Sequence, residues 1–148
     1  MRPYLSRPIG LTPVDIGASY YRADLVFDGV DHSGSSFALR VFFDNPDATH
    51  DTEASAENGY VGSVYVFGHG GCFGDEGHCD VPVRRRAFDD RPPHQLIPAK
   101  MWIEVTDAIR QLAQRQDQLV ITVVPIMPGE VAEDSQVSFQ KVSLVTYA

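Results

Sequence analysis

The chain has 148 residues and a formal net charge of −8, with 43% hydrophobic and 22% charged residues. This composition is typical of one globular domain and argues against an intrinsically disordered chain. An excess of carboxylates repels phosphate backbones and anionic lipid, so neither nucleic acid nor a membrane is an expected partner. No apolar run approaches the roughly 18 residues of a transmembrane helix, so none is expected.

The N-terminal segment is rich in proline, with Pro3, Pro8 and Pro13. Since proline fixes φ and lacks a backbone N–H, we expect residues 1–19 to form an extended arm before a single domain over 20–148. The segment lacks the apolar stretch of a secretory signal. This predicts a cytoplasmic protein, or a secreted one if the sequence is a piece of a longer chain.

Two segments with a hydrophobic period of two follow the arm, and each predicts a half-buried strand. The first strand is expected to stop at Asp28-Gly29 and the second before Asn45-Pro46-Asp47, because these residues favour turns. The inward face of the first strand would carry Tyr21, Ala23, Leu25 and Phe27. The inward face of the second strand would carry Phe37, Leu39, Val41 and Phe43.

The middle of the chain alternates strands with polar connections. Residues 44–59 are acidic, have no apolar period and predict a solvated loop. The segment Tyr60–Phe67 is rich in aromatic and β-branched residues and predicts a strand that leads directly into glycines. Residues 80–98 hold four prolines and predict an irregular crossing loop, and Met101–Val105 predicts a short strand.

One amphipathic helix is expected after this strand. Thr106 would be its N-cap, because the hydroxyl accepts from a free backbone N–H, and Asp107 would favour the positive end of the helix dipole. The short apolar run Leu119–Ile126 is typical of a strand that is covered on both faces. The last strand, Gln136–Tyr147, is expected to shift its inward set near Gln140-Lys141, as a β-bulge would.

Six predicted strands, one short helix and long Pro/Gly-rich loops indicate an all-β fold. We expect an antiparallel β-sandwich that is jelly-roll-like in its connections. A parallel sheet is not expected, because strands do not alternate with long helices.

The glycine-rich segment 67–80 contains both cysteines and two of the five histidines of the chain. Imidazole and thiolate are ligands that suit copper(I) or zinc. The candidate metal ligands are His69, Cys72, His78 and Cys79. His69 and Cys72 are spaced for one ion, whereas adjacent residues of an extended backbone point to opposite sides. A site with two or three ligands is therefore easier to build here than a closed site with four.

The same segment permits other interpretations. A disulfide between Cys72 and Cys79 would pin a short loop and make the protein a structural binding module without metal. The two thiols can also be reduced and inert. A small zinc hydrolase would need a general base, for which Glu76 is the only candidate.

The remaining histidines and the basic run are weaker candidates for a functional site than the glycine-rich segment. His32 lies in a turn and is expected to form hydrogen bonds, and His50 is expected to be solvated beside Asp51. Nothing in the position of His94 along the sequence requires it to approach the glycine-rich segment. The basic run 84–86 is expected to be a solvated loop, or else a docking patch for an acidic partner.

The run Tyr60–Asp80, with its Gly-His-Gly-Gly-Cys motif at 68–72, resembles the C-terminal β-sandwich domain of tyrosinases and polyphenol oxidases. Three further stretches agree with this family: Tyr21–Asp28, Leu39–Pro46 and Phe88–Pro98. The resemblance implies an all-β domain that packs over a dinuclear, type 3 copper enzyme, shields its active site and assists copper loading.

In that family the copper-binding histidines of the enzyme lie on a four-helix bundle. This chain has neither such helices nor six histidines, so we expect it not to be an enzyme. The expected function is a free-standing accessory or shielding domain whose partner is a tyrosinase-like or other type 3 copper oxidase. As a copper chaperone it would bind copper through His69, Cys72, His78 and Cys79.

Overall fold

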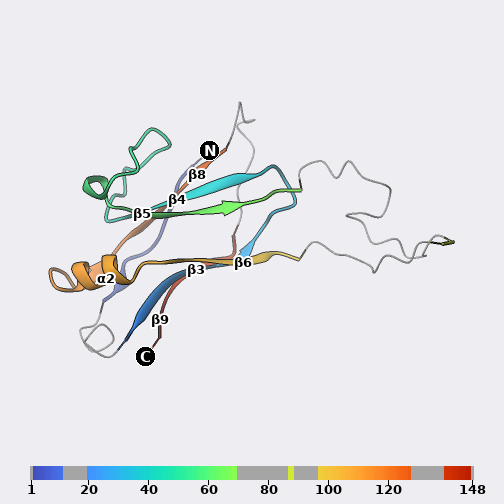
Figure 1. Cartoon of the computed structure of the whole chain (residues 1–148). Helices are drawn as coiled ribbons and strands as arrows, with labels where there is room; N and C mark the ends of the chain where they lie inside the picture. The colour runs from blue at the N-terminus through green and yellow to red at the C-terminus, as the bar shows by residue number, and fades with distance from the viewer. Residues whose placement is uncertain (1, 12–19, 70–86, 89–96, 128–138, 148) are drawn as a thin grey trace.

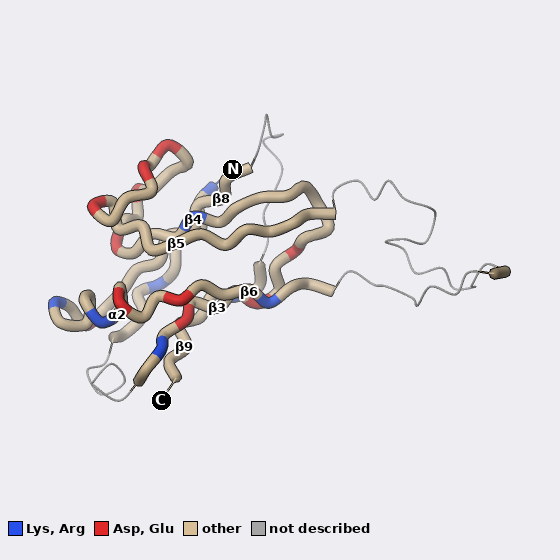
Figure 2. Tube along the Cα trace, viewed as in Figure 1, with Lys and Arg blue, Asp and Glu red and all other residues tan. Residues whose placement is uncertain are grey.

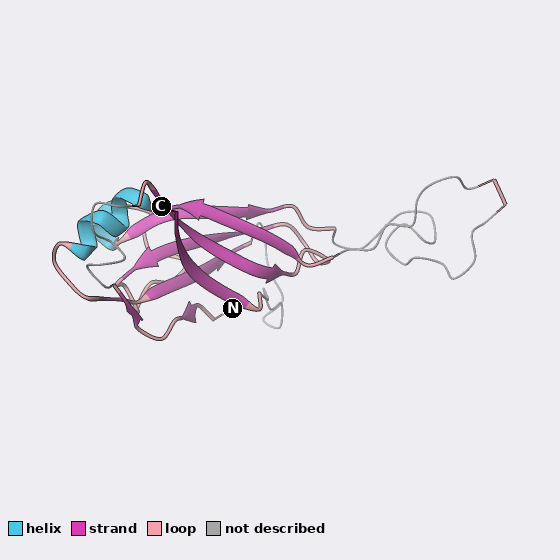
Figure 3. Ribbon diagram, turned by 90° about the horizontal axis from the view of Figure 1, so that it is seen from below, coloured by secondary structure: helices cyan, strands magenta, loops and turns pink. Residues whose placement is uncertain are grey.

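The computed structural model of the protein describes residues 2–11, 20–69, 87–88, 97–127 and 139–147 (Figure 1). Within these ranges the chain is mostly β-strand, its strand pairs are antiparallel, and one short α-helix is present. The predicted all-β antiparallel fold is confirmed. Viewed from below, the strands lie in layers with the helix at one end (Figure 3).

Two sheets contain most of the strands. The first has the order β1-β8-β4-β5 and the second the order β6-β3-β9, while β2 and β7 pair separately. The strands of the first sheet are β1 (Tyr4–Leu5), β8 (Ile121–Ile126), β4 (Phe37–Phe43) and β5 (Tyr60–Val66). Those of the second are β6 (Ala99–Glu104), β3 (Arg22–Val30) and β9 (Lys141–Tyr147). The small sheet contains β2 (Ile9–Gly10) and β7 (Gln118–Leu119).

The described part of the N-terminal arm is extended and pairs with these strands. Tyr4 lies opposite Val123, and Ile9 lies opposite Leu119. Leu11 is buried in the hydrophobic core. The arm therefore adds an edge strand to the first sheet.

Hydrophobic side chains from both sheets fill the space between them. In the second sheet, the predicted inward residues of β3 are fully buried: Ala23, Leu25 and Phe27. In the first sheet, the predicted inward residues of β4 are buried as well: Phe37, Leu39, Val41 and Phe43. Since side chains alternate across a strand, the period of two in each segment places one face of each sheet on this shared core.

Strand β3 differs from its predicted bounds at both ends. Tyr21 precedes the strand and is 67% exposed, so it does not belong to the inward set. The predicted stop at Asp28-Gly29 is wrong, because the strand continues to Val30 with irregular pairing to β6 after Phe27. Gly29 has a φ of 68°, a conformation that glycine adopts without strain, and it marks an irregular strand position rather than a turn.

The acidic connection 44–59 folds over the outer face of the first sheet. Ala48 is buried against Phe42 and Val124 in a second hydrophobic cluster, and a short 3-10 helix, η1 (Ala56–Asn58), follows it. The loop is therefore less solvated than predicted, because an alanine without any periodic pattern anchors it. Its acidic residues are exposed, and their positions along the loop are red in Figure 2. Strand β8 is covered on both faces, as its continuous apolar run predicted.

The helix α2 (Thr106–Ala113) begins at the expected place by a different mechanism. Val105 occupies the N-cap position, and no side chain caps the helix. The Thr106 hydroxyl instead accepts a hydrogen bond from the Ala23 backbone N–H at 3.0 Å and donates one to Glu104 at 2.9 Å. The prediction that Thr106 is the N-cap is wrong, because its hydroxyl accepts a hydrogen bond from a backbone N–H of β3 and not from the helix.

The last strand, β9, begins at Lys141 and not at the predicted Gln136, because residues 139–140 are not in strand conformation. Residues 136–138 lie outside the described residues. Phe139 packs on the core and is followed by Val142 and Leu144, so the inward set shifts across residues 140–141 as expected. The predicted strand over 119–126 is divided at Val120. The N–H of Val120 donates to the Asp44 carboxylate at 3.0 Å instead of to a neighbouring strand.

Candidate functional site

The chain beyond strand β5 brings His69 beside His32, which lies in the connection from β3 to β4. The His69 backbone N–H donates a hydrogen bond to the His32 carbonyl at 2.9 Å. One residue earlier, the Gly68 N–H donates to the Ser36 hydroxyl at 3.0 Å. These two bonds hold the residues after β5 against the connection, so two histidines far apart in sequence meet at one end of the sandwich.

Gly68 permits this approach because it has no side chain. A Cβ at this position would lie 2.2 Å from the Gly34 carbonyl oxygen and 2.3 Å from the Ser35 carbonyl carbon. Both neighbours are backbone atoms, which cannot rotate away as a side chain would. The glycine before His69 is therefore a steric requirement of the histidine pair.

The imidazole rings of His32 and His69 are in direct polar contact. Their Nδ1 atoms are 3.2 Å apart, and the ring centroids are 5.1 Å apart at an interplanar angle of 70°. The ring of Phe67 packs edge-on against His69 at 5.8 Å. Both histidines are half-buried, so the pair lies at the surface.

A backbone contact orients the His32 ring. Its Nε2 lies 2.9 Å from the Ile97 carbonyl oxygen, which only accepts hydrogen bonds, so Nε2 is the protonated nitrogen. In the neutral ring Nδ1 then holds a free lone pair, and it points toward Nδ1 of His69. The predicted hydrogen-bonding role of His32 is confirmed.

The separation of the two Nδ1 atoms suits two chemical arrangements. In the first, the Nδ1–H of His69 donates to Nδ1 of His32. In the second, both nitrogens are unprotonated and bind one metal ion. Two nitrogens at about 2.0–2.1 Å from a tetrahedral ion lie about 3.3 Å apart, close to the 3.2 Å found here. A metal-binding histidine usually donates its other ring N–H to a carboxylate, a backbone carbonyl or water. The contact of His32 Nε2 with the Ile97 carbonyl is of this kind.

Of the predicted metal ligands, only His69 belongs to the part of the chain that the structure describes. Cys72, His78 and Cys79 lie outside the described residues, as do Glu76, the basic run 84–86 and His94. Among the described residues no three His, Cys, Asp or Glu side chains gather as a metal site. His50 is exposed beside Asp51, at 3.3 Å, as expected.

His32 was not predicted to be a neighbour of His69. The two positions are separated by 37 residues, and no spacing rule links them. The only usable signal was that both residues lie near strand ends, with a glycine within two positions. Which strand ends meet is decided by the pairing of β4 with β5, which lines up Phe37 with Val66.

An Asp turn supports the backbone next to His32. The Asp31 carboxylate accepts hydrogen bonds from the Ser33 hydroxyl at 2.7 Å and from the Ser33 backbone N–H at 2.9 Å. These bonds, the hydroxyl first, lower the pKa of Asp31 below its usual 3.8. The carboxylate does not contact the imidazole of His32 by a hydrogen bond, so the Asp-His-Ser order of residues 31–33 is a turn and not a catalytic relay.

We expect the Asp31→Ala variant to be less stable than the wild type only where the carboxylate is ionised. The folded-state pKa is lowered, so the bonds stabilise the fold above the usual pKa of 3.8, and this contribution is lost as the pH falls through the folded-state pKa. Urea denaturation at about pH 5 should show a small difference in the free energy of unfolding, which shrinks steadily as the pH is lowered below 3.8. The Asp47→Ala variant, an exposed carboxylate of the acidic loop, is the control. A difference that persists at low pH would contradict the assignment.

Compared with known proteins, the sequence matches no protein-family model and no curated protein. Within the described ranges, none of the helices has the length and apolar character needed to cross a membrane.

Proposed function

We propose that this protein is a non-enzymatic accessory domain that binds copper(I) at the His32–His69 end of the sandwich and passes it to a type 3 copper oxidase. The observation that supports this most is the 3.2 Å contact between the two Nδ1 atoms. It lies where the glycine-rich segment begins, three residues before Cys72.

The local geometry suits a metal ion as well as a hydrogen bond between the two rings. The Ile97 carbonyl keeps the His32 lone pair on Nδ1, and the backbone bond from His69 to His32 sets the separation of the two residues. A prearranged pair does not have to be ordered when the ion binds, which lowers the entropic cost of binding. Copper(I) prefers soft sulfur ligands and also binds imidazole, so the two histidines and Cys72 together are a ligand set that suits it.

The surface position of the pair suits transfer better than permanent storage. Both rings are half-buried, so an incoming ligand from a partner protein can reach the ion. Exposed side chains surround the pair, including Phe67 at 78% and Ile97 at 72%. Apolar groups of this size at a functional loop are typical of protein contacts, which fits a domain that docks on an enzyme.

The test is a competition titration with a chromophoric copper(I) chelator under anaerobic conditions. We expect His69→Ala and His32→Ala each to weaken copper(I) binding by at least about tenfold. His50→Ala is the matched control, because this exposed histidine pairs only with Asp51 among the described residues. Unchanged affinity in both pair variants would exclude the pair as the site.

The cysteines and the partner are tested separately. Intact-mass measurement distinguishes a Cys72–Cys79 disulfide, lighter by two hydrogens, from reduced thiols that bind copper. Loss of copper in the Cys72→Ser, Cys79→Ser double variant would assign sulfur ligands, whereas a disulfide without metal would favour a structural binding module. Copper-loaded protein should activate an apo-tyrosinase faster than the copper-loaded chelator does. Equal rates would contradict the chaperone role.

A further inference from the structure

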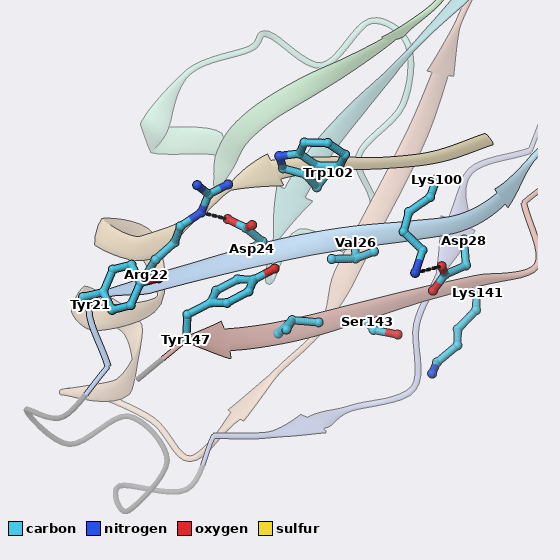
Figure 4. A pocket seen from close by; sticks show the side chains of 11 residues that line it. Tyr21, Arg22, Asp24, Val26, Asp28, Lys100, Trp102, Lys141, Ser143 and Tyr147 are labelled. Carbon is cyan, nitrogen blue, oxygen red and sulfur yellow. Dashed lines mark hydrogen bonds and ion pairs between the residues drawn. The ribbon is translucent and has the colours of Figure 1, made fainter.

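The outer face of the second sheet has an open groove on the side away from the core. Its volume is about 560 Å³, within the range of roughly 300–1,000 Å³ that is usual for small-molecule sites. The groove follows the central strand β3 from Arg22 to Asp28 (Figure 4). At about 3.3 Å per residue this stretch is about 20 Å long. Such a groove suits an elongated ligand better than a single small ring.

Aromatic side chains border this groove and remain exposed to solvent. Trp102 on β6 is 58% exposed, Tyr147 on β9 is 38% exposed, and Tyr21 before β3 is 67% exposed. The register explains two of these positions, because Trp102 lies opposite Val26 and Tyr147 lies opposite Arg22, so both project on the outer face. Exposed aromatic rings in one groove offer apolar, electron-rich surfaces for a ligand to stack on.

The floor of the groove contains ion pairs. Asp24 is only 2% exposed, although it lies on the outer face of the sheet, and it accepts a hydrogen bond from Arg22 Nε at 2.7 Å. This bond is the main reason that the pKa of Arg22 is raised. Further along, Lys100 Nζ lies 3.0 Å from the Asp28 carboxylate. Each pair places hydrogen-bond donors next to acceptors.

Ser143 adds a polar group between these pairs. It lies opposite Val26 on β9 and lines the groove. Its hydroxyl has no hydrogen-bond partner among the described residues. Ser143 therefore adds a buried hydroxyl to the floor of the groove, next to Val26.

We propose that this groove binds a neutral polysaccharide chain. Sugar rings have an apolar face of C–H groups that stacks on aromatic rings such as Trp102 and Tyr147, because the ring faces carry negative partial charge. Neighbouring sugar hydroxyls both donate and accept, so they match the adjacent donors and acceptors of the pairs Arg22–Asp24 and Lys100–Asp28. This site is separate from the histidine pair and does not depend on the proposed copper function.

Other ligand classes fit the groove less well. A peptide that adds as a strand needs a free strand edge, but β3 is paired along both sides, with β6 and with β9. Phosphate groups are bound best where several unpaired cations converge, whereas Arg22 and Lys100 each face a carboxylate, which leaves Lys141 as the one lining cation outside these pairs among the described residues. A lipid chain would cover the polar atoms of these ion pairs without offering them any hydrogen bond. The net charge of −8 also disfavours anionic polysaccharides.

Affinity electrophoresis in gels with and without soluble polysaccharide tests the proposal. The probes are hydroxyethylcellulose, mixed-linkage β-glucan, xylan and galactomannan, with polygalacturonate as the anionic comparison. We expect at least one neutral polymer to retard the wild type. Trp102→Ala should weaken this binding by at least about tenfold, and Trp102→Phe should retain part of it. Tyr65→Ala is the matched control, because this ring is 75% exposed on the other sheet.

Tryptophan fluorescence gives an independent readout, since Trp102 is the only tryptophan. Oligosaccharides of the retarding polymer should shift its emission to shorter wavelength, because stacking removes water from the indole. Tyr147→Ala retains the fluorophore and should weaken the response, and circular dichroism checks that the variants fold. The proposal is overturned if no neutral polymer retards the wild type, if only polygalacturonate does, or if Trp102→Ala and Tyr65→Ala behave alike.

Discussion

Replacing Phe27 by alanine is expected to lower the free energy of unfolding by about 3–5 kcal/mol. Phe27 is fully buried in the middle of β3 and packs edge-on against Phe139, with ring centroids 5.5 Å apart. It lies between Met101 of β6 and Val142 of β9 in the register of the sheet. The cavity left by the ring cannot collapse easily, because paired strands on both sides hold the backbone in place.

Urea denaturation followed by circular dichroism measures this loss. Tyr65→Ala is the control, because removal of an exposed ring should change stability by no more than about 0.5 kcal/mol. Phe27→Leu keeps most of the volume and remains measurable if the alanine variant does not fold. A loss below about 1 kcal/mol for Phe27→Ala would contradict the central place of this ring in the core.

Gly68→Ala is expected to separate His32 from His69 and to weaken copper(I) binding as strongly as loss of either histidine does. The added Cβ would meet the Gly34 carbonyl oxygen at 2.2 Å, so the backbone after β5 must move away from the connection that carries His32. An added group in a packed region of this kind lowers the free energy of unfolding by about 1–3 kcal/mol when the neighbouring atoms cannot move away. The hydrogen bond from the His69 N–H to the His32 carbonyl would break first, because it directly follows the displaced residue.

Gly34→Ala is the matched control on the opposite side of the same contact, since a Cβ there meets nothing within 4 Å. Stability is measured by urea denaturation and copper affinity by chelator competition. Destabilisation by Gly68→Ala with unchanged copper affinity would confirm the steric contact and contradict the metal site. An unchanged stability for Gly68→Ala would contradict the contact itself.

Local sequence patterns were sufficient for the strands whose neighbours are regular. The alternation in β3 and β4 identified residues such as Leu25 and Val41 as core, because a strand with one buried face must alternate. The patterns failed where a tertiary contact replaced a local one. Gly29 continues a strand instead of ending it, and Thr106 satisfies the backbone of Ala23 instead of capping its helix.

The candidate sites differ in how far the sequence revealed them. His69 was recognised from its glycine-rich surroundings, which are local. His32 was assigned only a hydrogen bond, because its proximity to His69 depends on how the ends of β3, β4 and β5 meet. The aromatic groove was not predicted, since Trp102 and Tyr147 come from strands that are distant in sequence and share only β3 as a neighbour.

The amino-acid sequence alone established an all-β chain, the inward faces of its two central strands and a segment rich in metal-binding side chains. These properties depend on periodicity and composition, which are local. The pairing of β3 with β6 and β9, and of β4 with β5, is non-local, and it is set by the burial of both sheets against one core. That pairing placed two imidazoles 3.2 Å apart and assembled the groove, because each site takes its residues from segments that meet only when the core forms.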